Sequence, residues 1–245
     1  MNCELEVIMF YGYGYNYGAE SYMLLLMIVP FILSIGAQIW VKAAYRKMLK
    51  IRNGRGYTGA QAAAAVLRYY GITDVRIEPV RGKLSDHFDP RTNVIRLSEG
   101  VYASDSVAAL GIACHEAGHA AQHAQNYAPV KVRNSIVPVC NIGSFAGIPL
   151  ALLGFYLAIP PLVWVGLGLY AMIAVFQLVT LPVELNASAR ALKVIEEAGI
   201  TYDGVERQGA KKVLTAAAMT YVAALAVTLM NLLRFALIIF GRQRN

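Results

Sequence analysis

The sequence predicts a mainly α-helical integral membrane protein with four transmembrane helices and a polar region that contains a short β-sheet. The 245 residues are 57% hydrophobic and only 15% charged, with a mean hydropathy of +0.48. That composition is too apolar for an ordinary soluble domain. Four stretches without a formal charge are each long enough to cross a bilayer as a helix, which takes roughly 17–25 residues.

The charge and cysteine content narrow the class further. The formal net charge is +7, and in so apolar a chain a basic cytoplasmic side of a membrane protein explains it better than a nucleic-acid partner. We therefore expect no nucleic acid partner. The three cysteines are odd in number and widely scattered, so they indicate neither a disulfide framework nor a zinc knuckle.

The first span is predicted at 22–41, and we expect it to be an uncleaved anchor. The preceding residues contain no Lys or Arg, and the aromatic and glycine run at 11–18 is interpreted as an interfacial anchor. Six basic residues follow the span between Lys42 and Arg55. The positive-inside rule therefore places the N-terminus outside and the chain from residue 42 onward in the cytoplasm.

Residues 42–133 form the main polar region. Capping and alternation predict a helix at 58–70, strands at 75–80 and 93–97 with a turn-rich loop at 84–93 between them, and a helix at 105–125. Thr58 is the expected cap of the first helix and Gly71 its stop. Ser104 or Asp105 is the expected cap of the second.

The C-terminal half carries the other spans, predicted at 135–158, 162–182 and 214–240. Pro182 is expected to start a separate helix that Gly199 ends, and Asp203 with Glu206 to cap the last helix. This count places 42–133 and 183–212 on the same side, and these two stretches hold 14 and 5 of the 22 Lys and Arg residues. Three arginines at or beyond the last span mildly oppose the rule, which leaves the side of the C-terminus open.

The segment 115–119 reads His-Glu-Ala-Gly-His, an H-E-x-x-H pattern on a predicted helix. Two histidines four residues apart lie on one helical face, so both imidazoles can bind one metal ion. The glutamate between them can take a proton from a water that the metal activates. Zinc suits this chemistry because it accepts three protein ligands and an open fourth position. Alone, the pattern is only moderately specific.

A catalytic zinc site needs a third protein ligand, and the sequence offers two candidates for it. His123 lies eight residues after His115, roughly 12 Å along the helix axis, so one ion cannot bind all three histidines. Glu184 follows a span directly, where an acidic side chain requires a reason. A helix N-terminus also favours an acid, but beside the histidine pair we interpret Glu184 as the ligand.

Four segments resemble the YugP-type family of membrane zinc metallopeptidases, and the H-E-x-x-H pattern with its downstream acid is similar to the gluzincin arrangement of HtpX-type membrane proteases. The segments are DHFDPRTNVIRLS at 86–98, GIACHEAGHAAQH at 111–123, LPVELNAS at 181–188 and TAAAMTY at 215–221. The resemblance covers essentially the whole chain.

The resemblance implies a bacterial membrane zinc peptidase, with one zinc per chain and a cytoplasmic, gluzincin-like α+β catalytic region in a single unit. It implies His115, His119 and Glu184 as ligands and Glu116 as the catalytic acid and base. HtpX-type proteins usually have an Asp four residues after the ligand Glu, where it orients a histidine. Here Ser188 stands at that position, so a hydroxyl would have to take over that role.

The expected reaction is endoproteolysis of membrane or membrane-proximal proteins, with Glu116 as general base. The expected partners are a protein or peptide substrate and the lipid bilayer, while a second copy or a regulatory membrane protein is left open. Stabilisation of the oxyanion requires a donor, and the strand at 93–97 is expected to offer an edge for an extended peptide. The candidate donors are Asn186, His87, Arg190 and Tyr221.

Two other classes compete with a protease. A non-proteolytic scaffold or chaperone-like protein would retain zinc for structure, but structural sites usually have four protein ligands. Only three are evident here, and Cys114 points about 100° away from His115 on the helix. A channel or transporter would show charged residues inside its spans, and the two middle spans show none.

Overall fold

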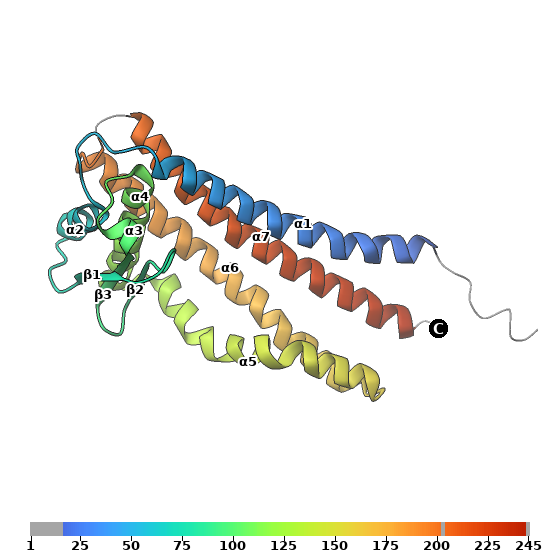
Figure 1. Ribbon diagram of the computed structural model, residues 1–245. Coiled ribbons are helices and arrows are strands. Elements are labelled where there is room, and N and C mark those ends of the chain that lie inside the picture. The colour runs from blue at the N-terminus through green and yellow to red at the C-terminus, as the bar shows by residue number, and fades with distance from the viewer. Residues whose placement is uncertain (1–16, 202–203, 244–245) are drawn as a thin grey trace, which may run out of the picture.

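The computed structural model describes residues 17–201 and 204–243. Four long helices dominate it, and a layer of short elements covers one end of them (Figure 1). The long helices are α1 (Tyr17–Leu49), α5 (Ala128–Tyr156), α6 (Pro160–Glu197) and α7 (Gly204–Gln243). The layer contains α2 (Gly59–Tyr69), β1 (Arg76–Val80), β2 (His87–Asp89), β3 (Val94–Ser98), α3 (Glu99–Tyr102) and α4 (Val107–Ala124).

Within the described residues, four helices are long and apolar enough to cross a membrane. They are Leu24–Leu49, Ala128–Tyr156, Pro160–Glu197 and Gly204–Ile239. In Figure 1, α1 runs beside α7, while α5 and α6 form a second antiparallel pair. Large apolar side chains point outward along the helices, for example Phe31 and Ile39 on α1. The predicted number of spans agrees with these four candidate spans.

Helix α6 is continuous through Pro182, so the prediction that Pro182 starts a new helix was wrong. A proline removes one backbone hydrogen bond, but a helix held by packing on both sides of that position continues through it. Val183 and Ala187, which follow the proline, are fully buried. As a result, one continuous helix carries both the apolar segment before Pro182 and Glu184.

The three strands form one small sheet in the order β1-β3-β2. Strand β3 pairs in parallel with β1 and antiparallel with β2. The strands predicted at 75–80 and 93–97 are confirmed, but β2 lies inside the segment that was predicted as a loop. Three residues between turn formers carry too little alternation to be recognised as a strand.

The β2–β3 turn is closed by Asp89. Its carboxylate accepts hydrogen bonds from the Thr92 hydroxyl at 2.7 Å, the Arg96 guanidinium at 3.0 Å and the Arg91 N–H at 3.0 Å. These bonds favour the charged form and hold the pKa of Asp89 well below its ordinary range. The turn therefore fixes β2 in register against β3, next to α4.

Side-chain caps set the start of α2 and α4. Thr58 forms the predicted cap of α2 together with Gln61, and Gly71 follows its end with a φ of +68°. Helix α4 is capped by Ser106, whose Oγ accepts from Ala109 N at 3.2 Å. The prediction of Ser104 or Asp105 was wrong. The Ser104 hydroxyl is bonded to Ser106, and Asp105 pairs with Arg52 at 3.2 Å and accepts from Asn53 N–H through its carbonyl.

The hydrophobic core lies between the short-element layer and the near ends of α6 and α7. Helix α4 passes through its centre and packs on α2, on α6 and on α7. The fully buried side chains include Val66, Ile95, Leu97, Leu110 and Ile195. This packing holds the face of α4 that carries the two histidines against α6.

Two expectations fall outside the described part of the chain. Most of the aromatic and glycine run at 11–18 precedes Tyr17, and Asp203 belongs to the gap before α7.

Candidate metal centre

The two histidines of the H-E-x-x-H segment lie on the face of α4 that is turned toward α6. Their rings meet edge to face, with centroids 4.7 Å apart. The Nε2 atoms of His115 and His119 lie 3.1 Å from each other. The spacing of one helical turn therefore brings the two nitrogens close enough for one metal ion to contact both, as expected from the sequence.

Glu184 reaches the same point from α6. Its Oε2 lies 3.3 Å from His115 Nε2 and 3.6 Å from His119 Nε2. Zinc–nitrogen bonds of about 2.0–2.1 Å place neighbouring donors of a tetrahedron about 3.3–3.4 Å apart. The three atoms thus match one face of a zinc coordination tetrahedron, and all of them lie within 4.8 Å of one another.

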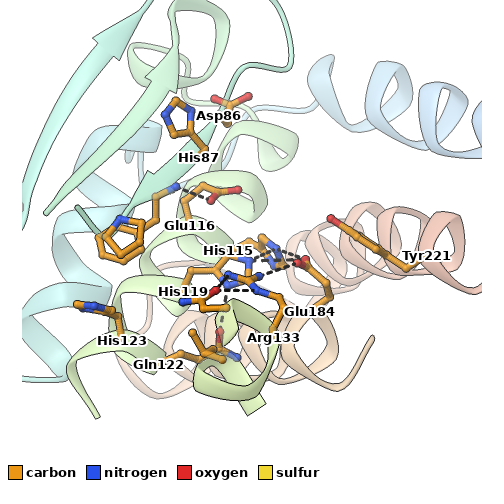
Figure 2. A pocket seen from close by; sticks show the side chains of 14 residues that line it. Asp86, His87, His115, Glu116, His119, Gln122, His123, Arg133, Glu184 and Tyr221 are labelled. Atoms are coloured by element: carbon orange, nitrogen blue, oxygen red, sulfur yellow. Dashed lines mark hydrogen bonds and ion pairs between the residues drawn. The ribbon is translucent and has the colours of Figure 1, made fainter. Parts of the chain in front are cut away.

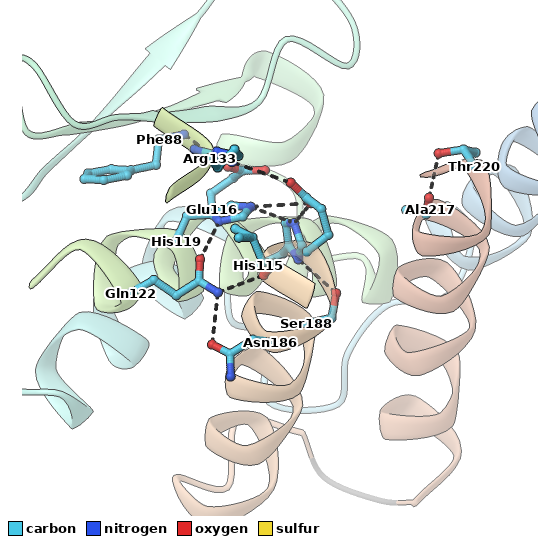
Figure 3. A network of polar contacts seen from close by, with 12 residues as sticks. Phe88, His115, Glu116, His119, Gln122, Arg133, Asn186, Ser188, Ala217 and Thr220 are labelled. Carbon is cyan, nitrogen blue, oxygen red and sulfur yellow. Dashed lines mark hydrogen bonds and ion pairs between the residues drawn. The ribbon is translucent and has the colours of Figure 1, made fainter. Parts of the chain in front are cut away.

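The other nitrogen of each ring is already bonded to an oxygen (Figure 3). His115 Nδ1 lies 3.1 Å from Ser188 Oγ, and His119 Nδ1 lies 3.0 Å from the amide oxygen of Gln122. An amide oxygen only accepts, so His119 Nδ1 carries the proton and its Nε2 presents a lone pair. If His115 Nδ1 donates to Ser188 in the same way, the lone pairs of both Nε2 atoms and the Glu184 carboxylate point toward one place. A cation bound there would be coordinated by all three.

Gln122 connects α4 to α6 behind the histidines. It is fully buried, and its amide nitrogen donates to Val183 O at 2.7 Å and to Asn186 Oδ1 at 3.0 Å. Sequence reasoning missed this residue. The available signal was its position three residues after His119, on the same helical face.

The electrostatics of the site also favour a positive charge. Burial opposes the charged form of His119, but the nearby carboxylates of Glu184 and Glu116 outweigh burial and raise the pKa of His119 above its ordinary value. Cys114, in contrast, is fully buried in apolar surroundings, which raises the pKa of its thiol. A neutral thiol is a poor metal ligand, in agreement with its predicted exclusion.

Glu116 lies beside the three donors and contacts the sheet. Its Oε2 accepts a hydrogen bond from the backbone N–H of Phe88 at 3.1 Å. Phe88 belongs to β2, one of the two outer strands, whereas β3 is the central strand and has neighbours on both sides. The prediction that the strand at 93–97 offers an edge was therefore wrong, and the strand edge that faces the site belongs to β2.

A cavity of about 250 Å³ opens in front of the donors, between α4, β2 and the start of α5. Figure 2 shows His87, Arg133 and Tyr221 around it, from three different elements. Arg133 Nη1 lies 4.0 Å from Glu184 Oε1, the carboxylate oxygen turned away from the histidines. Sequence reasoning missed Arg133, which was counted only among the basic residues of the cytoplasmic stretch.

Two predicted donors lie away from this cavity. Asn186 accepts hydrogen bonds from Gln122 and from Arg190 Nε, the latter at 2.7 Å. Arg190 stacks on Tyr70 and Tyr127 and donates to Gln125. His123 packs against Phe88 with ring centroids 5.7 Å apart and is not part of the donor group. His87 and Tyr221 remain the predicted donors that line the cavity.

Comparison with known proteins agrees with this geometry. Residues 23–240 match a family described as "Putative neutral zinc metallopeptidase". The chain belongs to this family. A Bacillus subtilis (strain 168) protein named "Putative membrane protease YugP" is 44% identical over 221 residues, which cover 90% of this chain and 98% of that protein. No solved structure matches the chain.

Membership in this zinc metallopeptidase family confirms the predicted resemblance to the YugP-type proteins. Together with the four apolar helices it supports a multi-pass membrane protein, and it implies zinc as the metal and peptides as the substrate. The further relation to gluzincins of the HtpX type stays a prediction.

Proposed function

We propose that the chain is a membrane-anchored, zinc-dependent endopeptidase that hydrolyses peptide bonds of membrane or membrane-proximal proteins. The observation that carries the proposal is the donor triangle of His115, His119 and Glu184, with edges of 3.1, 3.3 and 3.6 Å. Glu116 lines the same open cavity. Three protein ligands beside an open cavity are typical of catalytic zinc sites rather than structural ones.

One zinc ion per chain, held by these three side chains, would polarise a substrate carbonyl and lower the pKa of a water molecule. Glu116 would act as general base, taking a proton from that water and passing it to the leaving amine. Its hydrogen bond with Phe88 N–H orients the carboxylate toward the cavity.

Two side chains at the cavity can stabilise the negative charge that develops on the substrate oxygen. Tyr221 offers a hydroxyl from α7, and Arg133 offers a guanidinium from α5. Donors that are fixed in place before reaction are effective because they do not need to reorganise. We assign the oxyanion role to these two residues, with His87 at the outer rim.

The edge of β2 supplies a binding surface for the substrate backbone. The N–H of Phe88 is directed away from β3 and donates to Glu116, so this edge of β2 is turned toward the site. An extended peptide that pairs with this edge would be held by main-chain hydrogen bonds, which requires little choice of side chain. Such binding selects unfolded or exposed segments.

We further propose that the site faces the cytoplasm of a bacterial cell and that the N-terminus lies outside. Of the 22 Lys and Arg residues, 19 lie in the two stretches assigned to the cytoplasm. Both stretches contribute to the donor group, since His115 comes from the first and Glu184 from the second.

The decisive variant is Glu116→Gln in the full-length protein, purified in detergent. We expect it to bind one zinc per chain like the wild type but to cleave casein or a quenched peptide at least about 100-fold more slowly, because the general base is lost. Zinc content and EDTA-sensitive cleavage are measured on the same preparation.

The matched control is Glu99→Gln, an exposed acid of α3, which should cleave like the wild type. Full activity of Glu116→Gln would refute the assigned mechanism. A wild-type protein that binds zinc but cleaves no peptide would instead favour the alternative function, a non-proteolytic scaffold or chaperone-like protein that retains a zinc site.

A further inference from the structure

The residues of the donor group separate two cavities. The first, of about 250 Å³, lies toward β2 and α5, and the second, of about 200 Å³, lies toward α1 and α7. His115, Glu116, Glu184 and Tyr221 line both cavities. A peptide whose carbonyl lies at the donor group would therefore have the second cavity next to its scissile bond.

The walls of the second cavity are formed mainly by apolar side chains at helical spacing. Val213, Ala217 and Tyr221 lie at i, i+4 and i+8 on α7, so they form one stripe facing inward. Val41 and Tyr45 form a corresponding pair on α1. Apolar stripes of this kind leave a cavity that gains free energy from an apolar occupant.

The polar side chains at its edge already have partners. Asp86 accepts hydrogen bonds from Ser98 N at 2.7 Å and from Ser98 Oγ at 3.0 Å. Ser188 is bonded to His115. Apart from the three metal donors, Glu116 and the tyrosine hydroxyls, the cavity thus offers little to a neutral polar ligand, and an anionic one would lose its hydration without compensation.

We propose that this second cavity is the specificity pocket of the enzyme and that it takes one apolar side chain of the substrate, from a residue that flanks the scissile bond. The proposal rests on the proposed peptidase function. Consecutive Cα atoms are 3.8 Å apart, so a flanking residue reaches the cavity while its carbonyl lies at the donor group.

The size of the cavity limits the occupant to a single side chain. An apolar cavity of about 150 Å³ can hold a molecule as large as benzene. The cavity here, at about 200 Å³, therefore has room for the side chain of a leucine, methionine or phenylalanine. The substrate class that follows is a peptide segment with an apolar residue at the cleavage point, as found next to membrane spans.

The test compares peptides that differ only in the residue flanking the cleaved bond, which is located first by mass spectrometry of a digested peptide mixture. Full-length, zinc-loaded protein in detergent is assayed with Gly, Ala, Leu and Phe at that position. We expect the wild type to prefer Leu or Phe over Ala by about 10-fold or more in kcat/KM, the discrimination that apolar pockets provide.

Two variants change the volume of the cavity in opposite directions. Ala217→Leu fills it and should reduce the preference for Leu and Phe by about 10-fold or more, while cleavage of the Gly and Ala peptides stays near the wild-type rate. Val213→Ala enlarges it and should shift the preference toward Phe. The matched control is Ala224→Leu, at an exposed position about two helical turns further along α7 that does not line the cavity, which should keep the wild-type preference.

The possible results distinguish the pocket assignment from the peptidase function. Zinc-dependent cleavage without any side-chain preference would overturn the pocket assignment and leave the peptidase function standing. A loss in Ala217→Leu that is equal for all peptides, at unchanged zinc content, would also overturn it, since the cavity would then belong to a lipid chain or another group. Absence of cleavage by the wild type would refute the peptidase function itself.

Discussion

At the scale of single residues, the candidate metal centre depends on the partners of the two imidazoles as well as on their Nε2 atoms. His115 is oriented by the hydroxyl of Ser188, and His119 by the amide of Gln122. Both partners are neutral, so Glu184 carries the only formal negative charge among the donors. Outer partners of this kind fix ring orientation and are worth about 10–100-fold in metal affinity.

The Ser188 hydroxyl gives a direct test of this orientation. Ser188→Ala should lower zinc affinity by about 10-fold, because His115 Nδ1 loses its partner. Ser188→Asp should restore the affinity or increase it, because a carboxylate accepts the same hydrogen bond more strongly. The measurement is a competitive chelator titration of the full-length protein.

Ser144→Ala serves as the control, since the Ser144 hydroxyl is exposed and bonds only within its own helix at Asn141 O. If Ser188→Ala bound zinc as tightly as the wild type, the hydroxyl would have no part in the site.

The convergence of His115, His119 and Glu184 beside Glu116 could be predicted because the chemistry of a metal site limits the residue types and the helix repeat limits their spacing. Gln122 and Arg133 could not be predicted. The contacts of Gln122 reach residues more than 60 positions away, and its position three residues after His119 does not by itself distinguish it from a solvent-facing glutamine. Arg133 resembles any other positive charge next to a span, and only its 4.0 Å distance from Glu184 distinguishes it.

At the scale of elements, the site depends on how closely α4 approaches α6. The contact is made at Gly118, where a Cβ atom would lie 2.6 Å from the carbonyl oxygen of Ala187. Ala187 lies three residues after Glu184 on the same helix. The backbone contact and the third ligand are therefore positioned by the same stretch of α6.

Gly118→Ala should destabilise the protein by about 1–3 kcal/mol, because the added methyl group clashes with backbone atoms, and no side-chain rotation can relieve that clash. In an unobstructed helix the same change stabilises by up to about 1 kcal/mol, so the sign of the effect tests the contact. Zinc affinity should fall as well, since α6 carries Glu184 away from the histidines. Thermal unfolding in detergent and chelator titration measure the two effects.

Gly168→Ala is the matched control, because a Cβ at that position of α6 would meet no atom within 4 Å. It should be neutral or slightly stabilising. A Gly118→Ala protein at least as stable as the wild type would contradict the close approach.

Most elements were predictable from local patterns, and the exceptions have physical reasons. Strands β1 and β3 alternate and are flanked by turn residues, and α2 carries a complete capping box. Strand β2 forms because β3 is available to pair with it, which its three residues alone do not reveal. Pro182 was wrongly predicted to start a helix because the hydrogen bond that a proline removes can be recognised in the sequence, whereas the packing that offsets this loss cannot.

At the scale of the whole molecule, the described ends of the long helices sort into two groups (Figure 1). The start of α1, the end of α7 and the α5–α6 turn lie at one end, and the layer with the donor group lies at the other. Four crossings of one bilayer require this arrangement. The excess of Lys and Arg on the side of the donor group supports the proposal that this side faces the cytoplasm.

Cysteine labelling tests this orientation in intact bacterial cells, after replacement of the three native cysteines. A membrane-impermeant maleimide should modify Ile159→Cys, in the α5–α6 turn, from outside. Glu99→Cys, in the layer of the donor group, should react only after the membrane is permeabilised. The reverse pattern would place the active site outside the cell.

The continuity of α6 through Pro182 has a mechanical consequence. Two of the three donors belong to α4 in the short-element layer, and the third belongs to a helix that extends into the candidate membrane span. An ion bound between them would cross-link the layer to the helix bundle. Removal of the ion by a chelator should increase the rate of amide hydrogen exchange at the α4–α6 interface. A fragment that ends before α6 would keep the H-E-x-x-H segment but lack the third donor.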